Sequence, residues 1–361
     1  MTRKEKWFVG IVMLSVVFAA CDNTHEPGPG AGNHLLVPLK EGNAVLVRLQ
    51  DHAVTPSAVP AMAISTDAVV RRYGDAVYVV NRFGFDNVVV LDAATLAVRK
   101  QFSTGAGTNP QDIAVANERR VYVPLYQTGE VLVADPTLPD GSEVLARIPL
   151  TSIAENPTPT SAVVVGDAVY VALAFIDPVT YAAARNGLVA VIDVATNSLK
   201  TTIELPHRNP FARMQRVPSR DILVLNLAED FDGQAGCYAT VDLRLGRASC
   251  AVPNSACGGW SGALWATEGG HVYAAASAGF MADGTLCHFT IDGTVLKAGL
   301  SVDGSLTDVA VSDTGVVIAT STKGEGGLFF FDAASDTPLA TAPLTLGGVP
   351  AFASGLVFLT L

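Results

Sequence analysis

Charged side chains are scarce in this sequence. Asp, Glu, Lys and Arg together make up 16% of the 361 residues, and acidic residues outnumber basic ones by 34 to 23. The net charge of −11 disfavours a nucleic-acid partner, because phosphate backbones bind surfaces rich in Lys and Arg. The helix formers Glu, Lys and Met are also few. We therefore expect neither a nucleic-acid-binding protein nor a helical one.

Catalytic and cofactor-binding motifs are missing as well. The sequence contains no Gly-x-Ser-x-Gly nucleophile elbow, no phosphate-binding loop, no His-Glu-x-x-His zinc motif and no Cys-x-x-Cys-His haem attachment. We therefore expect no cofactor, and no residue receives a catalytic role. What the sequence has in plenty is Val and Ala, with 33 glycines and 20 prolines. Such a composition is typical of short strands joined by tight turns.

The longest apolar run lies at the N-terminus. Arg3, Lys4 and Lys6 precede an apolar stretch over residues 7–20. As a helix this stretch would rise only about 21 Å, which is short of the ~30 Å hydrocarbon core of a membrane. The pattern therefore predicts a signal peptide over residues 1–20 and not a transmembrane helix.

The end of that run, "VFAAC", resembles the lipobox of bacterial lipoproteins, although Phe18 stands where Leu is usual. The resemblance implies that Cys21 becomes the lipidated first residue. The alternative is an ordinary secretory signal followed by a chance cysteine. Residues 21–33 are polar and rich in Pro and Gly, which is typical of a flexible tether. We expect a protein that is lipid-anchored in the bacterial cell envelope, with its body in the periplasm or on the cell surface.

A pattern recurs along residues 34–361, the predicted folded domain. Apolar runs that end in Asp recur every 40 to 58 residues, at Asp92, Asp135, Asp193, Asp242, Asp292 and Asp332. Each follows a strand of alternating type, such as "AVYVVN" or "AVYVAL". This spacing suits a unit of four short antiparallel strands, here named A to D from the innermost outward, and predicts the blades of a β-propeller.

The stretch "VYVVN…VVVLDAATLAV" resembles the YVTN family of β-propeller repeats, most closely over residues 77–203. The resemblance implies an all-β propeller. In the repeat, an Asp and a Thr such as Asp92 and Thr95 can bond the nearby backbone and reverse the chain between strands C and D. We interpret these aspartates as turn formers and not as catalytic carboxylates.

Seven blades of four antiparallel strands account best for the repeat. Six copies are complete, and the seventh combines strands from the two ends of the domain, which closes the ring and removes free sheet edges. The C-terminal "VPAFASGLVFLTL" offers two strands, one more than the mixed blade can hold. An eight-bladed ring is the alternative.

The long loops fall on one face of this ring. In a four-stranded meander the A–B and C–D turns lie on one face, and the B–C and D–A loops lie on the other. The first set is uniformly short, whereas the second includes the long segments 175–187, 227–236 and 277–284. Long loops on a rigid scaffold are where binding sites usually lie, so we expect binding at this loop-bearing face.

Four cysteines besides Cys21 fall within 51 residues, at Cys237, Cys250, Cys257 and Cys287. In an exported protein they predict two disulfides, with three possible pairings. We favour Cys237 with Cys250, which face each other across one predicted hairpin, and hence Cys257 with Cys287, all at the loop-bearing face. A zinc site is the alternative, but no Cys-x-x-Cys pair supports it.

Candidate ligand-binding residues lie in the long loops. His207, Arg208 and Arg213 occupy a D–A loop near the predicted channel mouth and could hold an anion or carboxylate, and Tyr181 and Arg185 lie in the 175–187 loop. Among metals only calcium has a weak candidate. Asp230 and Asp232 in "EDFDG" resemble a fragment of a calcium loop, but the full twelve-residue pattern is missing and we favour a solvated acidic loop.

Together these features predict a non-catalytic binding or scaffold module for a protein or extracellular ligand, which touches the membrane through its lipid anchor only. The alternative is a lactonase-like hydrolase that would use His207 and an arginine near the channel mouth. Propellers include sugar lactonases and quinone-dependent dehydrogenases, but fold alone does not transfer function.

Overall fold

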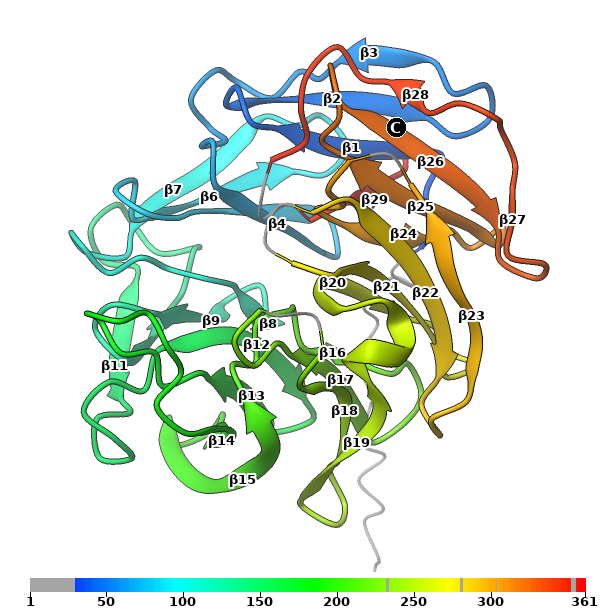
Figure 1. Cartoon of the computed structure of the whole chain (residues 1–361). Coiled ribbons are helices and arrows are strands. Elements are labelled where there is room, and N and C mark those ends of the chain that lie inside the picture. Colours follow the sequence, from blue (N-terminus) through cyan, green and yellow to red (C-terminus); the bar gives the residue numbers. More distant parts are fainter. Residues whose placement is uncertain (1–29, 232–233, 280–281, 303, 352–354) are drawn as a thin grey trace, which may run out of the picture.

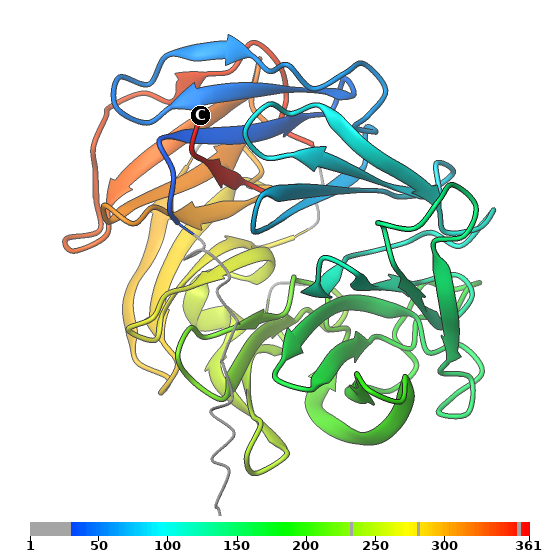
Figure 2. The same cartoon turned by 180° about the vertical axis from the view of Figure 1, so that it is seen from behind.

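The computed structural model describes residues 30–231, 234–279, 282–302, 304–351 and 355–361. These residues form seven antiparallel sheets arranged as a ring (Figures 1 and 2). The described chain contains one short 3-10 turn, η1 (Asn254–Cys257), and is otherwise strand and loop. The predicted all-β, seven-bladed propeller is confirmed.

Each blade runs from its innermost to its outermost strand. The first blade comprises β29 (Val357–Leu359), β1 (His34–Leu39), β2 (Asn43–Arg48) and β3 (Val54–Pro56). The next three comprise β4 (Ala68–Tyr73), β5 (Ala76–Asn81), β6 (Asn87–Asp92) and β7 (Val98–Ser103); β8 (Ala114–Asn117), β9 (Arg120–Leu125), β10 (Glu130–Ala134) and β11 (Val144–Pro149); and β12 (Pro159–Val165), β13 (Ala168–Leu173), β14 (Asn186–Asp193) and β15 (Ser198–Arg208).

The last three blades complete the ring. They comprise β16 (Gln215–Arg216), β17 (Ile222–Leu227), β18 (Cys237–Asp242) and β19 (Arg247–Pro253); β20 (Trp260–Ala266), β21 (His271–Ser277), β22 (Gly284–Thr290) and β23 (Val295–Ser301); and β24 (Val309–Val311), β25 (Val316–Ser321), β26 (Gly327–Asp332) and β27 (Thr337–Pro338), with β28 (Leu344–Thr345) also paired to β26.

The ring closes where the two ends of the domain meet. β29 pairs antiparallel with β1, with His34 opposite Leu359 and Leu36 opposite Val357. The C-terminal segment therefore supplies one strand to the mixed blade and the N-terminal segment supplies three. The surplus strand candidate near Pro350 makes only an isolated bridge to Leu39 at the end of β1. The seam thus holds four strands, which is why seven blades suffice.

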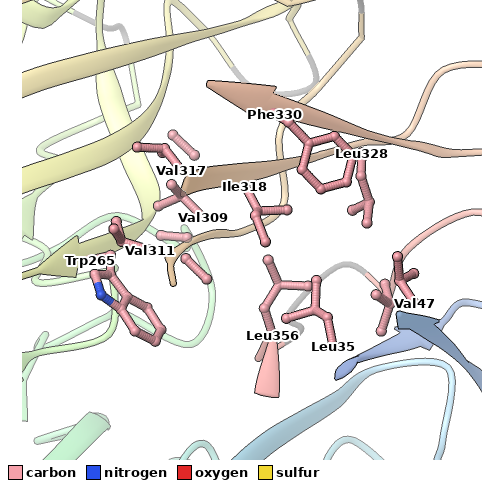
Figure 3. Packing of buried hydrophobic residues seen from close by; sticks show 14 of the residues in the cluster. Leu35, Val47, Trp265, Val309, Val311, Val317, Ile318, Leu328, Phe330 and Leu356 are labelled. Atoms are coloured by element: carbon pink, nitrogen blue, oxygen red, sulfur yellow. The ribbon is translucent and has the colours of Figure 1, made fainter. Parts of the chain in front are cut away.

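The core lies between neighbouring blades. Because each sheet is covered on both faces, alternate residues of one strand pack into two different clusters. Between the seventh and first blades, Leu35, Val47, Ile318, Phe330 and Leu356 pack together (Figure 3). This double coverage explains why the inner strands are nearly continuous runs of Val, Ala and Leu.

The repeated aspartates form turns, as predicted. Asp92 Oδ1 accepts hydrogen bonds from the backbone N–H groups of Ala94 and Thr95, at 3.0 and 2.8 Å, and from the Thr95 hydroxyl. Asp193 receives the matching bonds from Thr196. Hydrogen bonds from Arg99 and then from Thr95 hold the pKa of Asp92 well below its usual range. These carboxylates therefore stay charged and engaged with their turns.

The disulfides join the predicted pairs, but not all four cysteines lie at the loop-bearing face. Cys237 is bonded to Cys250 and Cys257 to Cys287, with Cα–Cα distances of 5.7 and 5.3 Å. Cys237 and Cys257 lie at the loop end of the blades, whereas Cys250 and Cys287 lie within β19 and β22. The bonded pair is not directly opposite, because Cys250 pairs with Ala239 and, past a bulge between Ala239 and Tyr238, Cys237 pairs with Pro253.

No helix among the described residues has the length and apolar character needed to cross a membrane.

Candidate functional site

A cavity of about 500 Å³ opens at the centre of the ring on the loop-bearing side. All seven blades contribute to its lining, through the D–A loops, the adjoining ends of the innermost strands and the B–C loops. Its volume lies in the range of pockets that hold small organic ligands. The loop-bearing face predicted from loop lengths is therefore also the face that carries the cavity.

The charged side chains of the lining come in equal numbers of each sign. Among the described residues, the lining holds three arginines and three aspartates and no Lys, Glu or His. Arg82 binds Asp67 through two parallel contacts, Nη2–Oδ1 at 2.7 Å and Nε–Oδ2 at 3.1 Å. A further Arg82 N–H donates to Gln111 Oε1 at 2.8 Å. This bidentate pair gives the cavity wall a fixed polar patch.

A second pair, Arg71 and Asp112, is almost fully buried, with side chains 10% and 2% exposed. Arg71 Nε lies 2.9 Å from Asp112 Oδ1, but these two atoms are not aligned for a hydrogen bond, so their contact is an ion pair. Asp112 Oδ2 also accepts from the backbone N–H of Ala162 at 3.3 Å. The carboxylate thus connects the second, third and fourth blades.

The third aspartate, Asp308, is buried where the seventh blade meets the seam. Its two carboxylate oxygens accept backbone N–H groups from Val309 at 2.8 Å and from Leu356 at 2.6 Å. Burial raises the pKa of Asp308 to about 6, against the opposing effect of these bonds and of Arg71 and Arg213. This carboxyl is therefore partly protonated near pH 6.

Aromatic side chains form one part of the cavity wall. Phe211, Phe231 and Trp260 pack edge to face around one another, with ring centroids 4.9 to 5.3 Å apart. The Trp260 Nε1 atom is buried and has no hydrogen-bond partner among the described residues. Tyr126 also lines the cavity, and burial raises the pKa of its hydroxyl.

The exposed aromatic residues of the described chain gather at the same face. Four Phe and Tyr side chains are exposed, namely Phe83, Phe85, Tyr181 and Phe211, and all lie in loops of the loop-bearing face. Three of them line the cavity, and Phe85 does not. Phe83 and Tyr181, 73% and 76% exposed, also have positive φ angles of 23° and 58°. Tyr181 ends an Asp-x-x-Thr turn that begins at Asp177, and Leu96 and Asn197 have positive φ angles at the same position of their turns, so this backbone belongs to the turn.

The residues predicted from sequence divide into two groups. Arg213 and Tyr181 line the cavity. His207 and Arg208 do not, because β15 continues as an outer strand through Arg208, which pairs with Asn186. Arg185 lies over the Phe175 ring, 4.9 Å from its centroid, also outside the lining.

Glu229 holds the two residues at the end of β15. His207 Nδ1 lies 2.8 Å from one Glu229 oxygen, and Arg208 Nε donates to the other at 2.7 Å. A second Arg208 N–H donates to Asp230 at 2.9 Å. The charged groups of this cluster are therefore bonded to one another beside the cavity.

Sequence reasoning missed Asp67, Asp112 and Asp308, together with Arg71 and Arg82. A pattern was available, because the three aspartates directly precede the innermost-strand segments in "TDAVV", "QDIAV" and "TDVAV". That position places a carboxylate at the cavity in three blades. Arg71 and Arg82 have no such repeated sequence context.

Metal ligands converge at one place in the described chain. His207, Cys237 and Cys250 present ligand atoms within 4.8 Å of one another. Both sulfurs belong to the disulfide, so neither is a thiolate that could bind zinc. Of the weak calcium candidates, Asp230 is paired with Arg208 and Asp232 lies outside the described residues.

No family model matches the chain and no curated protein matches its sequence, so the likeness to YVTN repeats rests on the motifs themselves. The fold does recur among solved structures. A quinoprotein alcohol dehydrogenase-like protein from Bacteroides thetaiotaomicron shares 12% identity, with a TM-score of 0.61 over 91% of this chain and 78% of that one.

Two further structures show the same architecture. The dihydro-haem d1 dehydrogenase NirN shares 14% identity, with a TM-score of 0.54 over 88% of this chain and 74% of that one. Hydrazine synthase from Kuenenia stuttgartiensis shares 15% identity, with a TM-score of 0.54 over 79% and 80% of the two chains. The likeness is one of fold alone.

Proposed function

We propose that this chain is an envelope-anchored binding protein whose propeller takes up an extracellular ligand in its central cavity without altering it chemically. The observation that carries the proposal is the concentration of exposed aromatic side chains at the cavity mouth. Water-exposed Phe and Tyr side chains are costly unless they contact a partner, and aromatic residues dominate binding energy in recognition sites. Here three of the four in the described chain line one cavity.

The arrangement of the polar groups favours binding over catalysis. Asp67 and Asp112 are paired with arginines, and both oxygens of Asp308 accept backbone N–H groups. A general acid or base needs a proton-transfer atom that can reach the substrate. The hydrolase alternative would use His207, which is bonded to Glu229 outside the cavity lining.

A ligand screen tests the proposal. We expect at least one member of a library of sugars, amino acids, short peptides, nucleotides and aromatic acids to raise the melting temperature of the propeller domain. Phe83→Ala and Tyr181→Ala should each weaken that binding at least tenfold in calorimetric titrations, because each removes an aromatic face at the cavity mouth. The chain supplies close controls in Phe85→Ala and Val179→Ala, which change exposed residues of the same two loops outside the lining.

Two results would count against the proposal. One is unchanged affinity in the Phe83 and Tyr181 variants. The other is recovery of the ligand in a chemically converted form, with conversion lost in His207→Ala, which would favour the hydrolase.

The anchor is proposed from the lipobox-like "VFAAC", which lies outside the described residues. In cells fed a radiolabelled fatty acid, we expect label in the wild-type protein and none in Cys21→Ser, because the thiol is the acylation site of a lipoprotein. Wild-type protein that carries no label would show an ordinary secretory signal instead. Fractionation of the same cells reports which membrane holds the protein.

A further inference from the structure

We infer that the ligand of the cavity is an uncharged saccharide, whose ring faces pack on the aromatic side chains of the mouth and whose hydroxyls bond the Arg and Asp side chains of the wall. This inference rests on the proposed function and names its ligand class. Three features carry it, which are the balance of charge, the hydrogen-bonding capacity left in the polar pairs and the aromatic mouth.

The balance of charge disfavours a charged ligand. The lining holds three arginines and three aspartates, and two of each are already joined as Arg82–Asp67 and Arg71–Asp112. A carboxylate or phosphate ligand that bonded the two remaining Arg82 N–H groups would lie beside the Asp67 carboxylate, and the two like charges would repel each other. A cationic ligand would meet the same obstacle with the signs reversed. A neutral ligand disturbs neither pair.

The Arg82–Asp67 pair has hydrogen-bonding capacity left. Arg82 uses Nε and Nη2 toward Asp67 and Nη1 toward Gln111, which is three of its five N–H groups. Each Asp67 oxygen accepts one of these bonds and can accept another. Donor and acceptor sites therefore lie side by side on one rigid patch. A sugar hydroxyl can both donate and accept a hydrogen bond. Two neighbouring hydroxyls can therefore accept from Arg82 N–H groups and donate to Asp67 oxygens.

The exposed aromatic rings at the cavity mouth suit the two faces of a sugar ring. A pyranose ring carries its hydroxyls mainly around the edge and presents C–H groups on its faces, which pack on aromatic rings. Phe83, Tyr181 and Phe211 supply exposed rings from three different loops of the cavity mouth.

The test is a set of calorimetric titrations at pH 7 with cellotriose, maltotriose, xylotriose, triacetylchitotriose and, as the anionic probe, trigalacturonic acid. We expect at least one neutral trisaccharide to bind with a Kd below about 1 mM and trigalacturonic acid to bind at least tenfold more weakly. Asp67→Asn leaves Arg82 without its counter-charge. In that variant the preference for the neutral sugar should fall roughly tenfold, equivalent to about 1.4 kcal/mol.

The control is Asp75→Asn, which breaks an Asp–Arg pair on the opposite face, where Asp75 binds Arg99 at 2.9 Å. It should leave both affinities unchanged, and melting temperatures show whether each variant folds. Tightest binding of trigalacturonic acid by the wild-type protein would overturn the inference. So would failure of every saccharide while another class from the ligand screen binds the cavity, a result that leaves the proposed function intact. If no compound of any class binds, both proposals are wrong.

Discussion

Replacement of Asp112 by Ala is expected to lower the free energy of unfolding by about 3–5 kcal/mol. The reason is that Arg71 loses its counter-charge. The Arg71 side chain is only 10% exposed, and its Nε lies 2.9 Å from Asp112 Oδ1. Without that carboxylate the buried cation would lose its directly paired counter-charge and keep only its longer-range attraction to Asp308, which costs more than the net value of the ion pair. Loss of the Ala162 N–H bond to Asp112 adds to the effect.

Urea unfolding of three variants separates this mechanism from simple loss of packing. The double variant Arg71→Met with Asp112→Leu removes both charges and should recover much of the stability, because no buried charge is left unpaired. Asp75→Ala breaks an exposed Arg pair and should cost less than about 1 kcal/mol. An Asp112→Ala protein as stable as Asp75→Ala would show that Arg71 finds water or another partner.

The second large effect is a dependence of stability on pH that originates at Asp308. Its pKa is about 6 in the folded protein, against about 3.9 for Asp in an unfolded chain. The folded state therefore binds this proton more tightly than the unfolded state does. The resulting stabilisation is fully present below about pH 4 and is lost as the pH rises through 6. Two pKa units correspond to about 3 kcal/mol, which is the expected size of the loss.

A comparison with Asp308→Asn isolates this group, because the amide does not titrate. Unfolding free energies of both proteins are measured in urea from pH 4 to pH 8. The wild-type value minus the variant value should fall by about 3 kcal/mol across this range, since the titrations of all other groups cancel. An offset that stays constant with pH would mean that Asp308 is charged throughout and that burial does not raise its pKa.

The fold could be predicted from the sequence because its determinants are local. Strand alternation, the Asp92 and Asp193 turns and the spacing of the repeats each involve residues close together in the chain. Ring closure follows from the need to pair the sheet edge at β1. The seam register could not be derived, because two C-terminal segments had the same apolar pattern and only their packing distinguishes them.

Most of the candidate site could not be predicted, because its pairs join different blades. Arg71 and Asp112 are 41 positions apart, and only the angular placement of two blades brings them together. His207 illustrates the opposite error. The sequence predicted that His207 lies in a D–A loop, yet β15 extends to Arg208 and keeps His207 on the outer strand. Loop length predicted the face that carries the cavity, whereas only packing determines which side chains line it.

The seam also has a consequence for the order in which the protein is made. The innermost strand of the first blade, β29, is synthesised more than 300 residues after its partner β1. Leu356, next to β29, lines the cavity and donates its N–H to Asp308. During synthesis, the inner edge of the first blade therefore stays unpaired until residues 356–359 have been made. A chain that stops short of residue 356 therefore lacks the closed ring and one part of the cavity wall.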